Sequence, residues 1–166
     1  MPDARHANLL EPEALVELFL RHPPQGFAAA SEADLPVFGT DFDLLTTLEP
    51  AILVKIRRFP LFGLWSRLLR FPARFAGTTA TEYAPLPKGL EPGALLDGFR
   101  ERCAAGQSLL IVKDVPEVSP LLGAGDNEAA MRLARIAPDK GFIVVEGQAL
   151  AYVPIDFSST DEYLSR

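Results

Sequence analysis

Helical and strand-like patterns alternate along the second half of this 166-residue chain, and this alternation constrains the fold more than any single motif. The predicted elements are, in order, a helix over 92–105, a strand over 108–113, a helix from Asp126 or Asn127 to about Ala137, and two strands over 141–145 and 148–155 joined at Glu146 and Gly147. Such alternation favours an α/β layer architecture over a helical bundle. Because 48% of the residues are apolar, the chain can form one domain with a core of its own.

Two of these elements also have residues that predict their boundaries and their buried faces. Pro92 lies in the first turn of the helix over 92–105 and Gly106 follows its end, as is typical of helix boundaries. The apolar face of this helix consists of Leu95, Leu96, Phe99 and Cys103. The unbroken apolar run in the strand over 108–113 predicts burial on both of its faces.

The first half of the chain begins with a predicted helix over residues 8–21. Asn8 can cap this helix, and Glu11 stands three residues later in capping-box spacing. Its predicted core face consists of Leu15, Leu18 and Phe19. Residues 27–43 are predicted to form an extended or loop connection, and a short strand is expected to begin with Phe42, Leu44 and Leu45.

The middle of the chain is predicted to form two short helices and a strand. The helices cover 50–59 and 61–70 and are separated by Pro60. The second helix has one apolar stripe, which consists of Leu61, Leu64, Trp65, Leu68 and Leu69. The strand over 74–84 is rich in threonine, and alternation places Thr79, Thr81 and Tyr83 on one face, which either lines a polar cleft or faces solvent.

Charge is distributed unevenly. The chain has 22 acidic and 16 basic residues and a net charge of -6, which argues against general nucleic-acid binding. Residues 55–74 are the exception, because they contain no acid and six bases, namely Lys55, Arg57, Arg58, Arg67, Arg70 and Arg74. Aromatic residues are interleaved with these cations. Such a segment can lie on an anionic membrane surface, bind a polyanionic ligand, or form an ordinary helix that packs its stripe inward.

Cysteine and histidine are too sparse for a disulfide or a metal cluster. Cys103 is the single cysteine, and its place on an apolar helical face predicts a core residue. His6 and His22 are isolated from other ligand-type residues in the sequence. The N-terminus does not have the pattern of a signal peptide, and the apolar runs are too short to span a bilayer. We therefore expect a cytoplasmic location, including the inner membrane surface.

Several strings along the chain resemble one bacterial protein family when they are taken together. They are residues 42–47 (FDLLTT), 75–83 (FAGTTATEY), 109–116 (LLIVKDVP), 147–157 (GQALAYVPIDF) and 161–166 (DEYLSR). Their order is similar to the N-terminal half of GNAT-superfamily proteins of the FemAB-like, peptidoglycan-biosynthesis-like group. The resemblance implies a mixed sheet flanked by helices, and transfer of an acyl group to an amine-bearing small molecule.

The resemblance also implies how the chain is organised. Residues 1–40 would form an N-terminal helix and extended segment, residues 41–157 a GNAT-like α/β domain, and residues 158–166 the start of a helix. Ser159 and Glu162 have capping-box form, but a helix of about one turn is not stable alone, since roughly 12–15 residues are needed. We therefore expect an incomplete domain whose partner is a missing C-terminal acyltransferase half, with a frayed polar tail as the alternative interpretation of residues 158–166.

Acyl-CoA is the donor implied for the full-length family. The family holds its pyrophosphate with a Gln/Arg-x-x-Gly-x-Gly/Ala loop, which the sequence lacks, so we expect no cofactor bound by this chain alone. Any group that the chain supplies would come from the acceptor side. The candidates are Thr81, Glu82, Tyr83, Lys113, Asp114 and Asp156. Lys113 and Asp114 close a predicted strand, where ligands of open α/β sheets gather, although a strand that leaves a core also ends in polar residues.

Two functions follow as hypotheses. The first is the acceptor-side or structural part of a GNAT/FemAB-like N-acyltransferase. The second is a non-catalytic binding module that docks to an anionic membrane surface or a protein partner through the basic segment 55–74.

Overall fold

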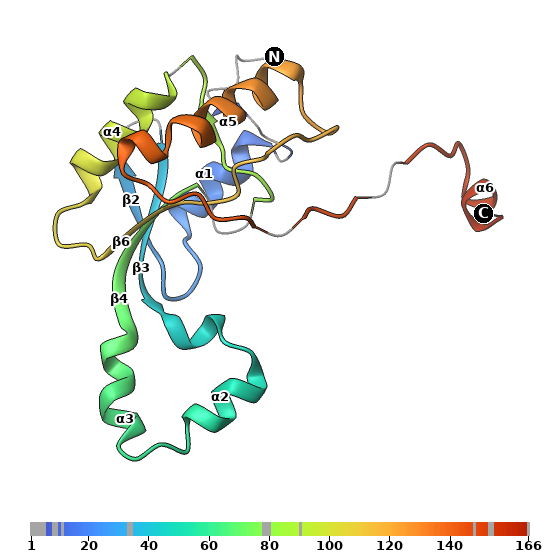
Figure 1. Cartoon of the computed structure of the whole chain (residues 1–166). Helices are drawn as coiled ribbons and strands as arrows, with labels where there is room; N and C mark the ends of the chain where they lie inside the picture. Colours follow the sequence, from blue (N-terminus) through green and yellow to red (C-terminus); the bar gives the residue numbers. More distant parts are fainter. Residues whose placement is uncertain are drawn as a thin grey trace.

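A four-stranded mixed sheet organises the chain in the computed structural model (Figure 1). Its strand order is β2–β3–β4–β6, and the strands are β2 (Ala28–Glu32), β3 (Leu35–Asp43), β4 (Arg70–Ala76) and β6 (Leu109–Val112). The first three strands are antiparallel, and β6 runs parallel to β4. The structure describes residues 6–7, 10, 12–32, 35–77, 81–89, 91–147, 149–152 and 155–165. The predicted α/β class is thus confirmed as a mixed sheet flanked by helices.

Helix α4 (Pro92–Cys103) makes the crossover that parallel pairing of β4 and β6 requires. The helix begins as predicted, with Pro92 in its first turn and the Glu91 carboxylate accepting a hydrogen bond from the Gly93 N–H at 3.0 Å. Beyond its end, Gly106 has a φ of 71°, a conformation that costs glycine little. Local signals therefore define the boundaries of this helix.

The core lies between one face of the sheet and the helices α4 and α5 (Ala124–Ile136). Its buried residues are Leu35, Val37, Ala76, Ala84, Leu86, Leu95, Leu96, Phe99, Cys103, Leu133 and Ala137. The predicted apolar face of α4, including Cys103, is confirmed. The expectation that the strand at 108–113 is buried on both faces is wrong, because β6 is an edge strand and Leu109 is exposed.

The second face of the sheet carries an aromatic group. Phe38 is fully buried and points away from the neighbouring Val37. Phe75 contacts Phe27 and Phe42 with ring centroids 6.2 and 6.1 Å apart. Strands β2 and β3 form a hairpin in the segment 27–43 that the sequence predicted only as an extended connection.

Helix α1 (Glu13–Arg21) contacts β2, and only Val16 among its described residues is buried. Leu18 is half exposed, so its predicted core position is wrong. The proposed cap at Asn8 and Glu11 lies outside the described residues. A second, two-stranded sheet pairs β1 (His6–Ala7) with β5 (Leu86–Pro87), and His6 Nδ1 lies 3.1 Å from the Glu13 carboxylate.

Strands β3 and β4 continue beyond the core as an antiparallel arm that ends at the pair Asp43 and Arg70. Residues 44–69, which we call the tip, connect these two residues and lie far from α4 and α5 (Figure 1). The tip consists of the 3₁₀ helix η1 (Leu44–Thr47), α2 (Pro50–Ile56), α3 (Phe62–Trp65) and the 3₁₀ helix η2 (Ser66–Leu69).

Three predictions for this region are wrong. Leu44 and Leu45 belong to η1 and not to a strand, since the Asp43 carboxylate accepts the Leu45 N–H at 2.9 Å and turns the chain. The helix expected over 61–70 is a single α-helical turn followed by 3₁₀ structure. The strand expected over 74–84 lies instead at 70–76, where it pairs with β3.

The C-terminal part also departs from prediction. Helix α5 begins at Ala124 with Gly123 as its N-cap, and Asn127 instead bonds the backbone of Ser119 at 2.8 Å through both its amide oxygen and its amide nitrogen. The 3₁₀ helix η3 (Pro138–Lys140) follows α5. The described residues of 141–152 form no strand, and Ile143 is 89% exposed, so the predicted hairpin is wrong.

The chain ends in a short helix, α6 (Thr160–Leu164), that stands apart from the sheet (Figure 1). Its capping box is formed as predicted, because the Ser159 hydroxyl accepts the Glu162 N–H at 3.2 Å and the Glu162 carboxylate accepts the Ser158 N–H at 2.8 Å. None of its described residues is buried. The capping box therefore marks the beginning of a helix that, at about one turn, is too short to be stable by itself.

Candidate functional site

Five of the six predicted acceptor-side residues lie near the carboxyl ends of β4 and β6. The Lys113 N–H donates to the Ala76 carbonyl at 3.3 Å, and the Ala84 N–H donates to the Asp114 carbonyl at 2.9 Å. These bonds bring the segment 81–84, with Thr81, Glu82 and Tyr83, next to the end of β6. The carboxyl edge of parallel strands is where ligands of open sheets bind.

The chemistry at this edge is modest. The Lys113 ammonium lies 2.5 Å from the Asp114 carboxylate, so the two charges neutralise each other. Asp114 has a φ of 56°, which an aspartate tolerates better than most residues. Thr81 is buried, Tyr83 half-buried and Glu82 exposed. The predicted alternation on one strand is wrong for Thr81 and Tyr83, which lie beyond the end of β4, and Thr79 lies outside the described residues.

Asp156 does not join this group. It lies in the exposed segment that leads to α6, which Figure 1 shows extending away from the sheet. Neither of the two cavities described below is lined by any of the six predicted residues.

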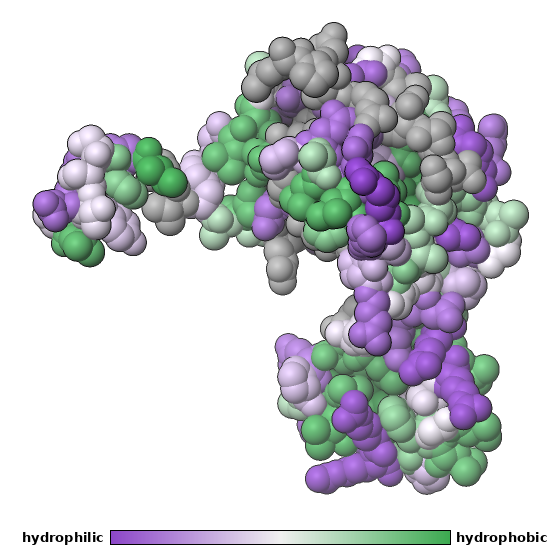
Figure 2. Space-filling view, turned by 180° about the vertical axis from the view of Figure 1, so that it is seen from behind, coloured by the Kyte–Doolittle hydropathy of each residue, from purple (hydrophilic) through white to green (hydrophobic). Residues whose placement is uncertain are grey.

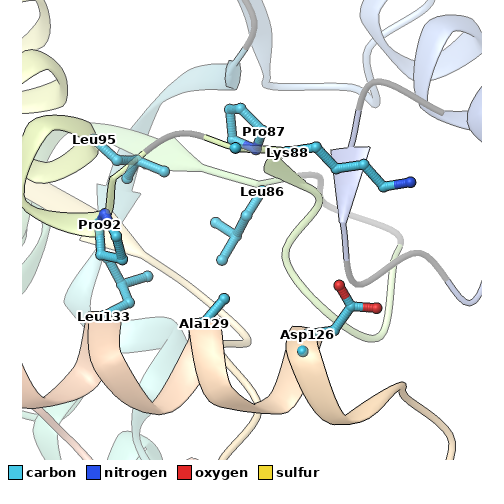
Figure 3. Close-up of a pocket in the computed structure, with 10 residues that line it drawn as sticks. Leu86, Pro87, Lys88, Pro92, Leu95, Asp126, Ala129 and Leu133 are labelled. Atoms are coloured by element: carbon cyan, nitrogen blue, oxygen red, sulfur yellow. The ribbon is translucent and has the colours of Figure 1, made fainter. Parts of the chain in front are cut away.

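One cavity, of about 340 Å³, lies between the segment 86–89, the start of α4 and α5. It is lined by Leu86, Pro87, Lys88, Gly89, Pro92, Leu95, Gly125, Asp126, Ala129 and Leu133. Figure 3 shows Leu86, Ala129 and Leu133 facing one another across it, whereas the Lys88 ammonium points away from them. The cavity therefore offers apolar contact. Sequence analysis did not identify it, because three separated segments form its wall.

The tip exposes several large apolar side chains and contains a concentration of basic residues. No described residue of α2, α3 or η2 is buried. The exposed large apolar side chains of this region are Leu44, Ile52, Val54, Phe59, Leu61, Leu64 and Leu68. The inward-packed stripe considered for this segment is therefore wrong, since Leu61 and Leu68 are 75% exposed and Leu64 is 66% exposed. Figure 2 shows the tip as a separate lobe on which apolar and charged surfaces adjoin.

This exposure rests on a locally ordered structure. The Trp65 indole N–H donates to the Pro60 carbonyl at 3.2 Å, and the Phe62 and Trp65 rings meet edge to face at 5.2 Å. Leu61 has a φ of 58°, a left-handed conformation that a branched side chain rarely adopts. Leu61 combines this conformation with a side chain that is 75% exposed.

Basic side chains surround the apolar ones. Residues 50–70 contain five of the six predicted bases and no acid. The Arg70 Nε lies 3.3 Å from the Asp43 carboxylate, whereas Lys55, Arg57, Arg58 and Arg67 have no ion-pair partner within the described part of the chain. Arg74, the sixth base, lies higher on the arm, where its guanidinium covers Gly39 of β3. The tip thus carries an excess of positive charge.

A second cavity, of about 230 Å³, lies inside the tip. It is lined by Asp43, Leu45, Thr46, Leu53, Arg57, Phe62, Ser66 and Arg70. Two predicted bases, Arg57 and Arg70, therefore share one hollow, although 13 positions separate them. Sequence analysis found the basic segment but not this juxtaposition, which depends on how the arm folds back on itself.

The chain matches no protein-family model, no curated protein and no solved structure. Among the described residues, no group of His, Cys, Asp or Glu can hold a metal ion, and no helix is long and apolar enough to cross a bilayer. The protein is thus a mixed α/β protein from which a tip with apolar and basic side chains projects.

Proposed function

We propose that this chain is a docking module that attaches its α/β body to an anionic membrane surface through the tip. One observation carries the proposal: exposed apolar side chains and an unbalanced positive charge coincide at the far end of the arm. Apolar surface of this kind on a soluble domain marks an interaction site. The basic side chains make an anionic surface its natural complement.

The combination matters because neither signal is sufficient alone. A basic residue close to an anionic leaflet contributes about 1 kcal/mol, and salt screens this contribution. Insertion of apolar side chains roughly 5–10 Å into the interface adds hydrophobic free energy that does not depend on salt. Leu61, Leu64 and Leu68 supply the second signal, and the five cations at 50–70 supply the first.

Co-sedimentation with lipid vesicles tests the proposal. We expect the chain to pellet with vesicles of equal parts phosphatidylcholine and phosphatidylglycerol, less so at high salt, and not with phosphatidylcholine alone. Arg58→Glu/Arg67→Glu should abolish pelleting because it reverses two exposed tip charges. Arg135→Glu on the exposed face of α5 is the control and should change little.

The apolar signal needs its own pair of variants. Leu61→Ser/Leu64→Ser should weaken pelleting, whereas Ile143→Ser, which changes an even more exposed apolar residue outside the tip, should not. The absence of pelleting by the unaltered chain would reject the membrane and favour a protein partner for the tip.

A second candidate function is the acceptor-side or structural part of a GNAT/FemAB-like N-acyltransferase, which the sequence strings indicate. The crossover β4–α4–β6 supports it, because it produces the mixed sheet flanked by helices that the resemblance implies. In such a reaction an amine attacks an acyl donor, with a general base removing its proton. The group at Thr81, Glu82, Tyr83, Lys113 and Asp114 is then the part of the acceptor side that this chain supplies.

Calorimetry with acetyl-CoA tests this second function. Residues 1–166 lack the donor loop of the family, so we expect no measurable binding by this chain alone. Tight binding of acetyl-CoA would contradict the assignment of this chain to the acceptor side.

A further inference from the structure

We infer that the cavity inside the tip binds the phosphodiester of a phospholipid head group; this deepens the proposed membrane docking and rests on it. The cavity is lined by Arg57 and Arg70, which carry guanidinium groups, and by Ser66, which carries a hydroxyl. Guanidinium groups bind phosphate oxygens with two parallel hydrogen bonds, which gives geometric selectivity that a lysine lacks.

The charge of the cavity matches a monoanion. Arg57 and Arg70 contribute two positive charges and Asp43 one negative charge, so the lining carries a net charge of +1. Arg57 has no ion-pair partner among the described residues. A phosphodiester carries one negative charge at neutral pH, and its binding would balance the site.

Asp43 positions the site and does not block it. Its Oδ1 accepts the Leu45 N–H at 2.9 Å, and its Oδ2 accepts from the Arg70 Nε at 3.3 Å. The Arg70 guanidinium is thereby anchored at one nitrogen, and its two terminal nitrogens remain as donors for a ligand. Thr46 donates its hydroxyl proton to the Asp43 carbonyl at 2.7 Å, so Ser66 is the hydroxyl available as a donor.

The apolar part of the lining distinguishes a lipid from a free phosphate ion. Leu45, Leu53 and Phe62 form this part of the wall, and the neighbouring Leu61 and Leu64 are exposed. Inorganic phosphate gains nothing from such a wall, whereas the glycerol and upper acyl chains of a lipid bury apolar surface against it. The volume of about 230 Å³ lies below the roughly 300–1,000 Å³ of pockets that enclose drug-sized ligands, so it suits a head group and its glycerol with only the beginning of the acyl chains.

Titration with a short-chain lipid tests the inference separately from docking. Dihexanoyl-phosphatidylglycerol, kept below its micelle concentration, should bind the unaltered chain in a saturable manner, as followed by Trp65 fluorescence or calorimetry. Arg57→Gln/Arg70→Gln should weaken this binding by about tenfold or more, because it removes charged hydrogen bonds. Inorganic phosphate should compete only weakly.

The matched control removes the same charge from the same tip. Arg58→Gln/Arg67→Gln leaves the cavity lining intact and should retain the affinity for the short-chain lipid. Equal weakening by both double variants would overturn the site and leave only non-specific attraction, while vesicle docking would still stand. Phosphate binding as tight as lipid binding would overturn the lipid assignment.

A conservative variant guards against loss of structure. Arg57→Lys keeps the charge but not the paired hydrogen bonds, so it should weaken the short-chain lipid while vesicle pelleting stays close to that of the unaltered chain. Circular dichroism of each variant should match that of the unaltered chain. An Arg57→Lys variant with unchanged lipid affinity would reject a guanidinium-specific site.

Discussion

The body and the tip of this molecule treat apolar residues in opposite ways. In the body, Val37, Phe38 and Phe99 are fully buried. In the tip, Phe59, Leu61 and Leu64 are largely exposed and are surrounded by cations. The same residue types therefore stabilise the fold in one region and remain available for an external surface in the other.

Removal of the tip is the strongest test of this difference between the body and the tip. Replacing residues 44–69 by an Asn-Gly turn between Asp43 and Arg70 keeps the register of the arm. We expect complete loss of vesicle binding but a body that unfolds cooperatively, with a free energy of unfolding changed by only about 1–2 kcal/mol, since closing a shorter loop has a small entropic effect. Urea unfolding measures this, and a body that fails to fold would show that the tip is structural.

The next largest difference is expected in the free energy of unfolding of two phenylalanine variants, one in the body and one in the tip. Phe99→Ala should destabilise the chain by about 3–5 kcal/mol because it leaves a cavity in the core. Phe59→Ala, in the tip, should change the free energy of unfolding by no more than about 0.5 kcal/mol. Thermal and urea unfolding of the two variants measure the contrast, which disappears if Phe59 supports the fold.

A smaller effect is expected where a side-chain amide supports the loop before α5. Asn127→Ala removes the paired hydrogen bonds to the backbone of Ser119, which is buried. The cost should be about 1–3 kcal/mol, since a buried polar group loses its partner. Glu128→Ala, at the adjacent exposed position, is the control for helix propensity, and a cost as large as that of Asn127→Ala would contradict this explanation.

The smallest effect is expected at the beginning of α4. Glu91→Ala removes the cap on Gly93 and the ion pair with Arg132 at 2.6 Å. We expect a loss of about 1 kcal/mol in the free energy of unfolding, mainly from the cap, because an exposed ion pair contributes little. Arg132→Ala removes only the ion pair and should cost less, and an equal cost would assign the effect to the pair instead.

The elements that could be predicted from the sequence are those with local signals. The start of α4 at Pro92, its buried face with Cys103, the turn at Gly106 and the capping box at Ser159 all follow from residues within a few positions of one another. The signals for these elements are local, although burial of the α4 face also requires its partners in the sheet and in α5. The mixed sheet was likewise anticipated, because the resemblance implied it.

The wrong predictions concern which side of an element is buried. The stripe at Leu61 and Leu64 has helical spacing, but spacing cannot show that the arm carries it away from the core. The run at Ile143 has strand character, but no described strand pairs with it. Periodicity shows which residues share one side of an element. Whether that side is buried depends on a partner that is distant in the sequence.

The candidate sites also differ in whether local sequence signals could predict them. The position of Lys113 and Asp114 just after a strand could be predicted, because the apolar run of β6 ends locally at Val112. The cavity that joins Arg57 to Arg70 was missed, since it requires the pairing of Asp43 with Arg70 at the end of the arm.

Strand β4 joins two of the features described above, because Arg70 at its start borders the tip and Ala76 at its end borders the group at Lys113 and Asp114. Seven residues of extended chain span roughly 20–24 Å. If the tip rests on a bilayer, the length of this strand sets the distance between the lipid and the group at Lys113 and Asp114. Whatever reaches that group must then either come from the aqueous side or be a long molecule that rises from the membrane to meet it.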